Sequence, residues 1–205
     1  NNFFQVRAAA RPVYAPREKA DIIIAFDKEA VEANKAALAP GGLLVLDAEK
    51  LRIKELAKGW FNAPIYALAQ EAGGPIYANA VALGIIAALI CENFDNAARA
   101  VEREFSAKGG GVAVKNRQAA GKGYDYAVEN IKDRVFRLAG APHSRNLLIA
   151  GNEALALGVI SAGCRFYTAY PMSPSTGIMD TVADYAGKYG IIVEQAEDEI
   201  AAVNM

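Results

Sequence analysis

The sequence is poor in the side chains that most often bind metal ions or carry nucleophilic catalysis. Its 205 residues include two cysteines and one histidine. Cys91 and Cys164 are too few and too far apart to form a zinc or iron–sulfur site, so we expect two buried, reduced thiols. His143 is the single histidine. These counts argue against a metal site or a histidine-based triad in this chain.

Long apolar runs and a strong charge of one sign are also missing. No run of about 18 or more apolar residues occurs, and residues 1–14 lack the charged-then-apolar layout of a signal peptide. We therefore expect a cytoplasmic chain with no membrane partner. The net charge is −1, and the basic residues along 99–137 are interspersed with acids, which argues against a nucleic-acid surface. The hydrophobic content of 53% is enough for a sizeable core.

Residues 1–130 alternate between short apolar runs and helical patterns. The run 20–26 is typical of a buried strand, and Asp27 after it is a suitable helix cap. The expected elements are, in order, strand 20–26, helix 28–38, strand 43–47, helix 48–59, strand 64–69, an all-round apolar helix 76–93, a helix 95–107 capped by Asp95, and one or two helices within 108–131. Strands that alternate with helices predict a parallel sheet with crossover helices, so the expected fold class is α/β.

A second strand–helix pattern begins after residue 145. We expect 131–145 to link two domains, and 146–205 to form a second parallel-sheet domain. After an opening strand and helix, its expected elements are strand 164–170, helix 176–190 closed by Gly190, strand 191–196 and the start of a helix at 197–205. That helix ends the chain after about two turns, which is marginal by itself, and the chain does not begin with Met. We therefore expect two partial α/β domains, 1–130 and 146–205, from a longer polypeptide.

Residues 168–176, TAYPMSPST, lie between an expected strand and an expected helix. Pro171 and Pro174 restrict the backbone there, so this strand exit is held stiff. It follows the carboxyl end of a parallel strand, where α/β proteins bind their ligands, and either Ser175 or Thr176 can cap the next helix. A proline-stiffened turn that binds nothing explains the same residues about equally well.

The next strand ends in an acidic segment. Glu197, Asp198 and Glu199 are expected on the first turn of a helix, where helix capping with solvated charge explains most such trios. However, two consecutive strand exits, one stiff and rich in hydroxyl groups and the other acidic, would face the same crevice of a parallel sheet. This pairing makes that crevice the candidate binding site.

These two segments carry a resemblance to a known family. Residues 151–205 resemble the start of the alpha subunit of 2-oxoacid:ferredoxin (acceptor) oxidoreductases, whose hallmarks are an A-Y-P-[IM]-[ST]-P-[SA] loop and a Q-x-E-D-E-I-A-A-[IV]-N-M segment. Both motifs are present in that order, as AYPMSPS and QAEDEIAAVNM. Residues 11–47 and 116–127 are similar to parts of the family's gamma subunit. A gamma part followed by an alpha part matches a fused arrangement found in the family.

The resemblance implies a thiamine-diphosphate-dependent and CoA-dependent oxidative decarboxylation of a 2-oxoacid to an acyl-CoA, with electrons passed to ferredoxin. It implies that a beta subunit binds the diphosphate and Mg²⁺, and that 4Fe-4S clusters lie in partner subunits rather than in this chain. The motifs are closer to the branch that uses 2-oxoglutarate or a broad range of 2-oxoacids than to the pyruvate branch. The whole assembly is thus expected to be a hetero-oligomer.

The resemblance also assigns roles to particular residues. It places the carboxylate that contacts the aminopyrimidine ring at Glu199, and a hydroxyl group facing the substrate carboxylate at Ser173. It places the walls of the substrate pocket at Tyr170 and Pro171. The Glu199 carboxylate is expected to point inward and to be partly desolvated, as general acid–base work requires.

Two further interpretations stay open. The chain is a non-catalytic α/β binding module in the first, with 1–130 holding a nucleotide or CoA, although no G-x-G-x-x-G follows a strand. In the second it is an assembly domain, with the apolar helix 76–91 buried in a subunit interface. Under the oxidoreductase interpretation, we expect the chain alone to bind thiamine diphosphate weakly or not at all, because the diphosphate and Mg²⁺ sites belong to the partner.

Overall fold

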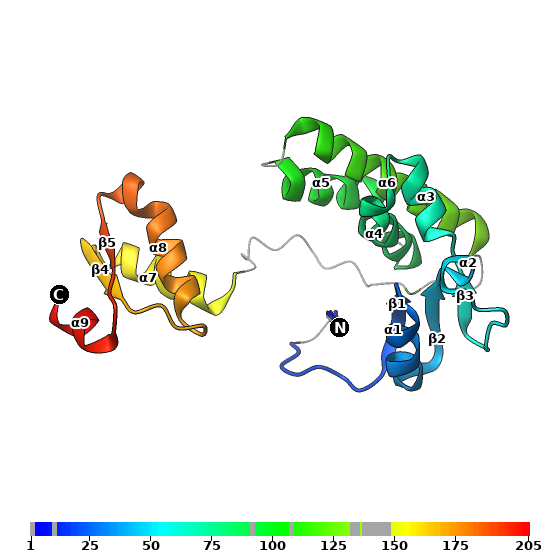
Figure 1. The fold of residues 1–205 in the computed structure, drawn as a ribbon, viewed down its shortest axis with the longest axis horizontal. Coiled ribbons are helices and arrows are strands. Elements are labelled where there is room, and N and C mark those ends of the chain that lie inside the picture. The colour runs from blue at the N-terminus through cyan, green and yellow to red at the C-terminus, as the bar shows by residue number, and fades with distance from the viewer. Residues whose placement is uncertain (1–2, 10–11, 91–92, 107–108, 132–135, 137–148) are drawn as a thin grey trace. The chain divides into compact units, whose positions relative to one another are not determined.

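The computed structural model describes residues 3–9, 12–90, 93–106, 109–131, 136 and 149–205. The chain divides into two compact units, Asn1–Ala141 and Pro142–Met205 (Figure 1). We call them the N-terminal unit and the C-terminal unit and describe each by itself. The expected linker 131–145 falls almost entirely outside the described residues.

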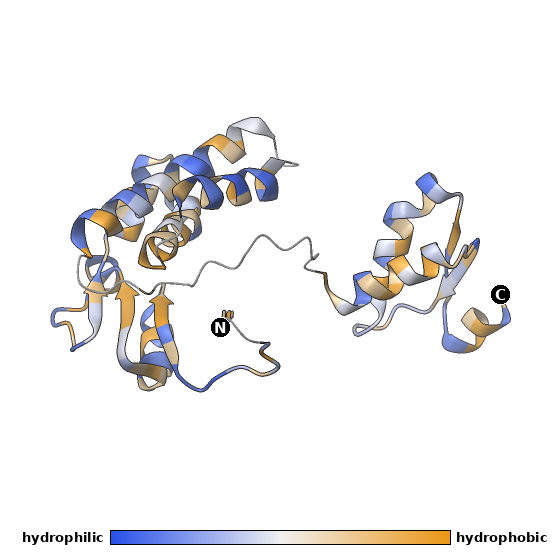
Figure 2. Cartoon of the chain, turned by 180° about the vertical axis from the view of Figure 1, so that it is seen from behind, coloured by the Kyte–Doolittle hydropathy of each residue, from blue (hydrophilic) through white to orange (hydrophobic). Residues whose placement is uncertain are grey.

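The N-terminal unit is built on a three-stranded parallel sheet. Its strands lie in the order β1 (Ala20–Ala25), β2 (Leu38–Leu46) and β3 (Trp60–Asn62). Successive side chains of β2 point to opposite faces: Leu43 and Val45 join one hydrophobic cluster, and Leu44 and Leu46 join another. Figure 2 shows hydrophobic residues gathered toward the ends of β1 and β2. The central strand is therefore buried on both faces, as is usual in a parallel sheet.

Helix α1 (Lys28–Asn34) covers one face of this sheet. It begins as predicted at Asp27, whose carboxylate accepts a hydrogen bond from the Ala30 amide at 2.6 Å. A short 3₁₀ turn, η1 (Lys35–Ala37), leads directly into β2. The helix is thus shorter, and the second strand longer, than the sequence predicted.

Two predicted elements of this unit are wrong. The predicted helix 48–59 is reduced to α2 (Ala48–Leu51), because Arg52 adopts a left-handed φ of 53° that ends the helix. The predicted strand 64–69 is instead helix α3 (Ile65–Glu71), and the third strand is the shorter β3 before it. A short apolar run fits a buried helix as well as a buried strand, so contacts elsewhere in the fold decide between them.

A layer of helices covers the other face of the sheet. Besides α3 it consists of η2 (Pro75–Tyr77), α4 (Ala78–Leu89), α5 (Phe94–Phe105) and α6 (Gly110–Asn130). Helix α4 is buried on most sides, as predicted, and packs mainly against α6. Helix α5 begins at Asn93, whose side chain accepts the Asp95 amide hydrogen bond, so the prediction of Asp95 as its cap is wrong.

The C-terminal unit contains a two-stranded parallel sheet. Its elements are α7 (Gly151–Ser161), β4 (Phe166–Ala169), α8 (Thr176–Tyr189), β5 (Ile192–Gln195) and α9 (Glu199–Asn204). Helix α8 connects the two strands and ends, as predicted, at Gly190, which has a φ of 64°. Ala156, Val182 and Ile191 form the buried core of this unit. The expected opening strand before α7 lies mostly outside the described residues.

Both sheets are open and parallel, which confirms the predicted α/β class. Across the described residues, no single helix is long and apolar enough to cross a membrane; α3 and η2–α4 pass that test only as a pair bent by 120°. Cys164 is a free thiol that is only half-buried, less than predicted, and its Sγ lies 3.1 Å from the Phe166 carbonyl oxygen. Cys91 and His143 lie outside the described residues.

Candidate functional site at the carboxyl edge of the second sheet

The ends of β4 and β5 lie side by side. The two strands are in register from Phe166–Ile192 to Ala169–Gln195. The Ala196 amide then donates to the Ala169 carbonyl oxygen at 3.0 Å, which continues the pairing one residue beyond β5. Because the strands are parallel, the segments that follow them leave the sheet at the same edge, where α/β proteins bind ligands.

Residues 170–176, which we call the proline corner, form a tight turn after β4. The Met172 carbonyl oxygen accepts hydrogen bonds from the Ser175 amide at 2.9 Å and from the Thr176 amide at 2.8 Å. It also accepts the Thr176 hydroxyl at 2.7 Å and the Ser175 hydroxyl at 3.4 Å. Ser175 occupies the N-cap position of α8, as predicted, but its side chain makes no capping hydrogen bond.

A second contact fixes the proline corner from outside. The side-chain amide of Asn152, at the start of α7, donates to the Pro174 carbonyl oxygen at 2.9 Å. Sequence reasoning missed this residue. The contact joins residues 22 apart, so no local sequence pattern marks it.

The predicted substrate-side residues differ in exposure. Ser173 is exposed, and within the described residues its hydroxyl makes no hydrogen bond. Tyr170 is 37% exposed, and Pro171, the second residue of the proline corner, is half-buried. The Ser173 hydroxyl is thus free to donate to a ligand, whereas its neighbours Ser175 and Thr176 are engaged inside the turn.

The acidic segment after β5 is arranged differently from the prediction. Asp198 is the N-cap of α9, and its carboxylate accepts the Ala201 amide at 2.6 Å. Glu199 is the first residue of the helix, and Glu197 precedes the cap, so only Glu199 lies on the first turn. All three are exposed. The described residues therefore do not give Glu199 the partial desolvation that the sequence analysis expected.

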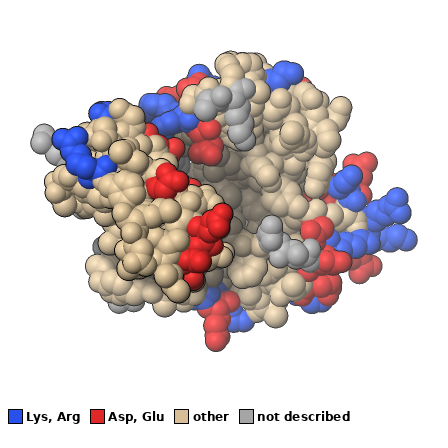
Figure 3. Space-filling view, turned by 60° about the vertical axis from the view of Figure 1, so that its left-hand side comes forward, with Lys and Arg blue, Asp and Glu red and all other residues tan. Residues whose placement is uncertain are grey.

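Helix α9 packs back across the sheet edge toward β4. The Thr168 hydroxyl of β4 donates to the Met205 sulfur at 3.5 Å. Glu199 and the proline corner are consequently held by the same two strands. Figure 3 shows acidic side chains in patches on the face of the molecule that this view brings forward.

The Tyr167 phenol of β4 has a raised pKa. Its burial is the main cause, and Cys164 makes a smaller contribution.

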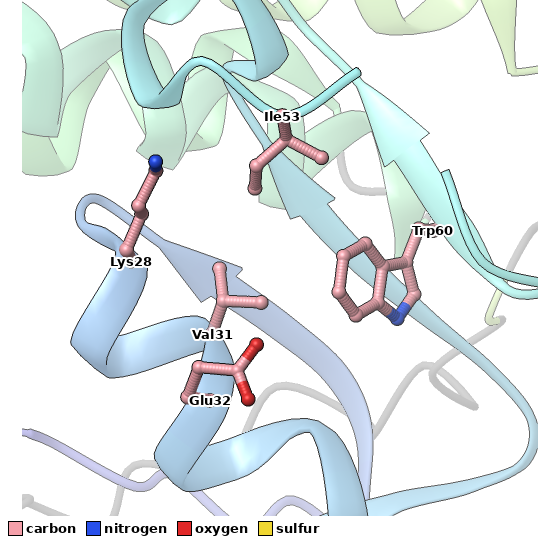
Figure 4. Close-up of a pocket in the computed structure, with 5 residues that line it drawn as sticks. All are labelled: Lys28, Val31, Glu32, Ile53 and Trp60. Carbon is pink, nitrogen blue, oxygen red and sulfur yellow. The ribbon is translucent and has the colours of Figure 1, made fainter. Parts of the chain in front are cut away.

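The N-terminal unit offers a different kind of recess. It has a volume of about 270 Å³ and lies between α1 and β3, on the face of the sheet (Figure 4). Its lining residues are Lys28, Val31, Glu32, Ile53 and Trp60. Lys28 is the one cationic side chain among these lining residues, and the Glu32 carboxylate lies in the same recess. Glu32 is also paired with Lys35. This recess thus has no concentration of positive charge for a phosphate group.

The carboxyl edge of the first sheet is filled by the protein's own polar groups. The Asp47 carboxylate accepts the Lys50 and Tyr66 amides at 3.0 and 2.9 Å. The Asn62 side chain accepts the Ala48 amide at 2.8 Å, and the Tyr126 hydroxyl donates to the Asn62 carbonyl oxygen at 3.3 Å. Burial, and then the charge of Asp47, raise the pKa of Tyr126. These groups satisfy one another and leave the second sheet as the better candidate site.

Comparison with known proteins identifies the family. The family model for pyruvate ferredoxin/flavodoxin oxidoreductase matches residues 1–126, which is more than half of the chain. The chain belongs to this family. A second model, for the thiamine-diphosphate-binding domain of pyruvate flavodoxin/ferredoxin oxidoreductase, matches residues 157–205 of this oxidoreductase chain and so includes both strand exits.

Individual relatives carry 2-oxoglutarate in their names. The 2-oxoglutarate synthase subunit KorA of Archaeoglobus fulgidus is 46% identical over 57 residues, which are 28% of this chain and 16% of that protein. The 2-oxoglutarate oxidoreductase subunit KorA of Mycobacterium tuberculosis is 22% identical over 233 positions, 98% of this chain and 35% of that protein. The oxidoreductase chain thus spans about a third or less of the length of these relatives.

A solved structure matches almost the whole chain. The 2-oxoglutarate:ferredoxin oxidoreductase of Magnetococcus marinus, whose structure contains 2-oxoglutarate, coenzyme A and succinyl-CoA, has 32% sequence identity and a TM-score of 0.80. The match covers 95% of this chain and 35% of that one. Together with the family models, it confirms the prediction of a 2-oxoacid:ferredoxin oxidoreductase subunit.

Proposed function

We propose that the chain contributes the aminopyrimidine-facing side of the active site in a 2-oxoacid:ferredoxin oxidoreductase. The proposed reaction is the CoA-dependent oxidative decarboxylation of a 2-oxoacid to an acyl-CoA, with electrons passed to ferredoxin. The observation that carries the proposal is the adjacency of two strand exits, one ending in the proline corner and the other in Glu199. The match of residues 157–205 to a thiamine-diphosphate-binding family model supports it.

The residues at this edge fit the cofactor chemistry. Thiamine diphosphate, when bound, supplies the electron sink that decarboxylation next to a carbonyl group requires. Glu199 offers an exposed carboxylate at the ligand-binding edge of the sheet. In our proposal this carboxylate holds a proton at the aminopyrimidine ring nitrogen. The surface of a partner subunit shields Glu199 from water, because the described residues of this chain leave it exposed.

The proline corner forms the substrate side of the proposed site. The free hydroxyl of Ser173 donates a hydrogen bond to the carboxylate of the 2-oxoacid, and Tyr170 and Pro171 form the walls beside it. The stiff turn holds this hydroxyl in place before substrate arrives, which reduces the entropy lost on binding. The names of the KorA relatives favour 2-oxoglutarate, or a broad set of 2-oxoacids, as the substrate.

The remaining parts of the reaction are assigned to partners. A beta subunit holds the diphosphate and Mg²⁺, and 4Fe-4S clusters in partner subunits carry the electrons to ferredoxin. The assignment of the clusters to partners rests on the sequence, whose two cysteines are too few for a 4Fe-4S ligand set.

The structure weakens the assembly alternative. That interpretation relied on an apolar helix at 76–91 that is buried by another subunit. In the structure, most of the apolar surface of α4 is instead buried within its own unit, chiefly by α6. The binding-module alternative loses its best position as well, because the edge of the first sheet is closed by Asp47 and Asn62.

The test is the substitution Glu199→Gln in the complete enzyme with its partner subunits. Gln keeps the shape of the side chain and removes its ability to take up a proton. We expect deuterium exchange at C2 of bound thiamine diphosphate to slow by about 100-fold or more. The matched control is Glu197→Gln, which removes the same charge two residues earlier and is expected to leave the exchange rate within about twofold. Exchange at the wild-type rate in Glu199→Gln would contradict the proposal, as would equal losses in both variants.

A further inference from the structure

Two hydrogen-bonded carbonyl groups lie on either side of the Ser173 hydroxyl, which makes no hydrogen bond within the described residues. On one side of Ser173, the Met172 carbonyl oxygen accepts the amides of Ser175 and Thr176. On the other side, the Pro174 carbonyl oxygen accepts the side-chain amide of Asn152 at 2.9 Å. The hydrogen bonds to the Met172 carbonyl oxygen come from within the turn itself. The hydrogen bond to the Pro174 carbonyl oxygen comes from α7, where Asn152 lies 22 residues before Pro174 in the chain.

Asn152 is itself held in place. It is half-buried at the start of α7, which packs beside α8. Its side chain lies against Gly177 in the first turn of α8, where an added Cβ would be 3.1 Å from Asn152 Nδ2 and 3.5 Å from its Cβ. A side chain at this position would press on Asn152, whose side chain would then have to shift. The amide therefore joins α7, the start of α8 and the proline corner.

We propose that Asn152 is a positioning residue for the 2-oxoacid, acting through Ser173. This inference rests on the proposed function, because it takes Ser173 to be the substrate-side hydroxyl. Pro174 has no amide hydrogen, so its carbonyl oxygen is the backbone group through which this residue can be hydrogen-bonded, and the Asn152 side chain supplies the donor. With the Asn152 contact present, the Ser173 hydroxyl is held at one place over the sheet edge. Without it, only the Met172 side of the turn is fixed.

The first variant is Asn152→Leu in the complete enzyme. Leucine keeps the branched shape of asparagine, removes the donor and adds no charge that could repel an anionic substrate. We expect kcat/KM for the 2-oxoacid to fall about fivefold to tenfold, the size expected for one lost hydrogen bond. The KM for CoA and the rate of C2 deuterium exchange on thiamine diphosphate should stay within about twofold, because neither depends on Ser173. The matched control is Asn130→Leu, which removes a similar bond, from Asn130 Nδ2 to the Tyr126 carbonyl oxygen at 2.8 Å, in the other unit.

A double-mutant cycle with Ser173→Ala separates positioning from general damage. If Asn152 acts through Ser173, the double variant has the same kcat/KM for the 2-oxoacid as Ser173→Ala alone, within about twofold. Losses that multiply would overturn the proposal, and so would an unchanged kcat/KM in either single variant or a parallel loss of C2 exchange in Asn152→Leu. Failure of the proposed function is recognised separately, by normal C2 exchange in Glu199→Gln.

Discussion

The carboxylate of Asp47 joins two helices to the end of one strand in the N-terminal unit. One oxygen accepts the Lys50 amide at the start of α2, and the other accepts the Tyr66 amide at the start of α3. The residue is only 5% exposed. A buried carboxylate at the end of a parallel strand is a common sign of a binding site. Here both oxygens already have protein partners, so the role of Asp47 is structural.

Replacing Asp47 with Ala should destabilise the N-terminal unit by about 2–3 kcal/mol, because two helix-start amides lose their acceptor in a largely buried place. The single tryptophan, Trp60, lies in β3, so its fluorescence during urea unfolding reports on this unit alone. The control is Glu55→Ala, which removes an exposed carboxylate and should change the free energy of unfolding by less than about 0.5 kcal/mol. Equal effects of the two substitutions would refute the structural role.

Some caps made by neighbouring residues were predictable, although the cap of α5 was not, and contacts between distant residues were not predictable. Asp27 was recognised as a helix cap because its partner, Ala30, is three residues away. The bond from Asn152 to Pro174 joins residues 22 apart, and the one from Tyr66 to Asp47 joins residues 19 apart. Such pairs depend on the arrangement of whole elements. The sequence therefore offered candidate site residues along the chain but did not indicate what holds the proline corner.

Two glycines set the distance between α4 and α6. A Cβ added at Gly84 of α4 would lie 1.9 Å from the Ala120 carbonyl oxygen, and one added at Gly123 of α6 would lie 2.0 Å from the Val81 carbonyl oxygen. The neighbouring atoms are backbone, so a side-chain rotation cannot relieve the overlap. The two helices are in direct backbone contact, and each needs a glycine where it meets the other.

The substitution Gly123→Ala should therefore cost about 3 kcal/mol, although alanine is normally the better residue inside a helix. The matched control lies on the same helix: Gly111 has nothing within 4 Å of an added Cβ, and Gly111→Ala should stabilise by about 0.5–1 kcal/mol. Urea unfolding followed by Trp60 fluorescence measures both. Opposite signs are the expected result, and two stabilising substitutions would mean that the helices are not in backbone contact.

The success of the element predictions did not depend on the length of the run alone, because 191–196 forms a strand as predicted whereas 64–69, a run of the same length, forms a helix. The apolar run of α4 and the strands β1, β4 and β5 were recognised because each fits one periodicity clearly. The short run 64–69 was assigned to a strand, but it forms α3, whose first turn is fixed by Asp47. The strand Trp60–Asn62 is too short to give a pattern of its own. These errors moved one strand without changing the α/β class.

The two units differ in the size of their cores. Within the described residues, the N-terminal unit has fully buried side chains from β2, α3 and α4, including Leu43, Ile65 and Ile85. The buried cluster of the C-terminal unit consists of Ala156, Val182 and Ile191, under a sheet of two four-residue strands. A two-stranded sheet with so small a core is marginal by itself. We therefore expect the unit that carries the proposed site to be the less stable one.

Hydrogen exchange followed by mass spectrometry should reveal this difference in the 205-residue chain. Opening of a marginal unit costs little free energy, so we expect the amides of β4 and β5 to exchange at least about 100-fold faster than those of β2 and α4. Adding thiamine diphosphate and Mg²⁺ should leave the exchange of β4 and β5 unchanged, because the proposed diphosphate site belongs to a partner subunit. In the complete enzyme the same amides should become protected, since further protein then covers Glu199 and the proline corner. Slow exchange of β4 and β5 in the isolated chain, or protection by the cofactor alone, would show that this unit needs no partner to form its ligand site.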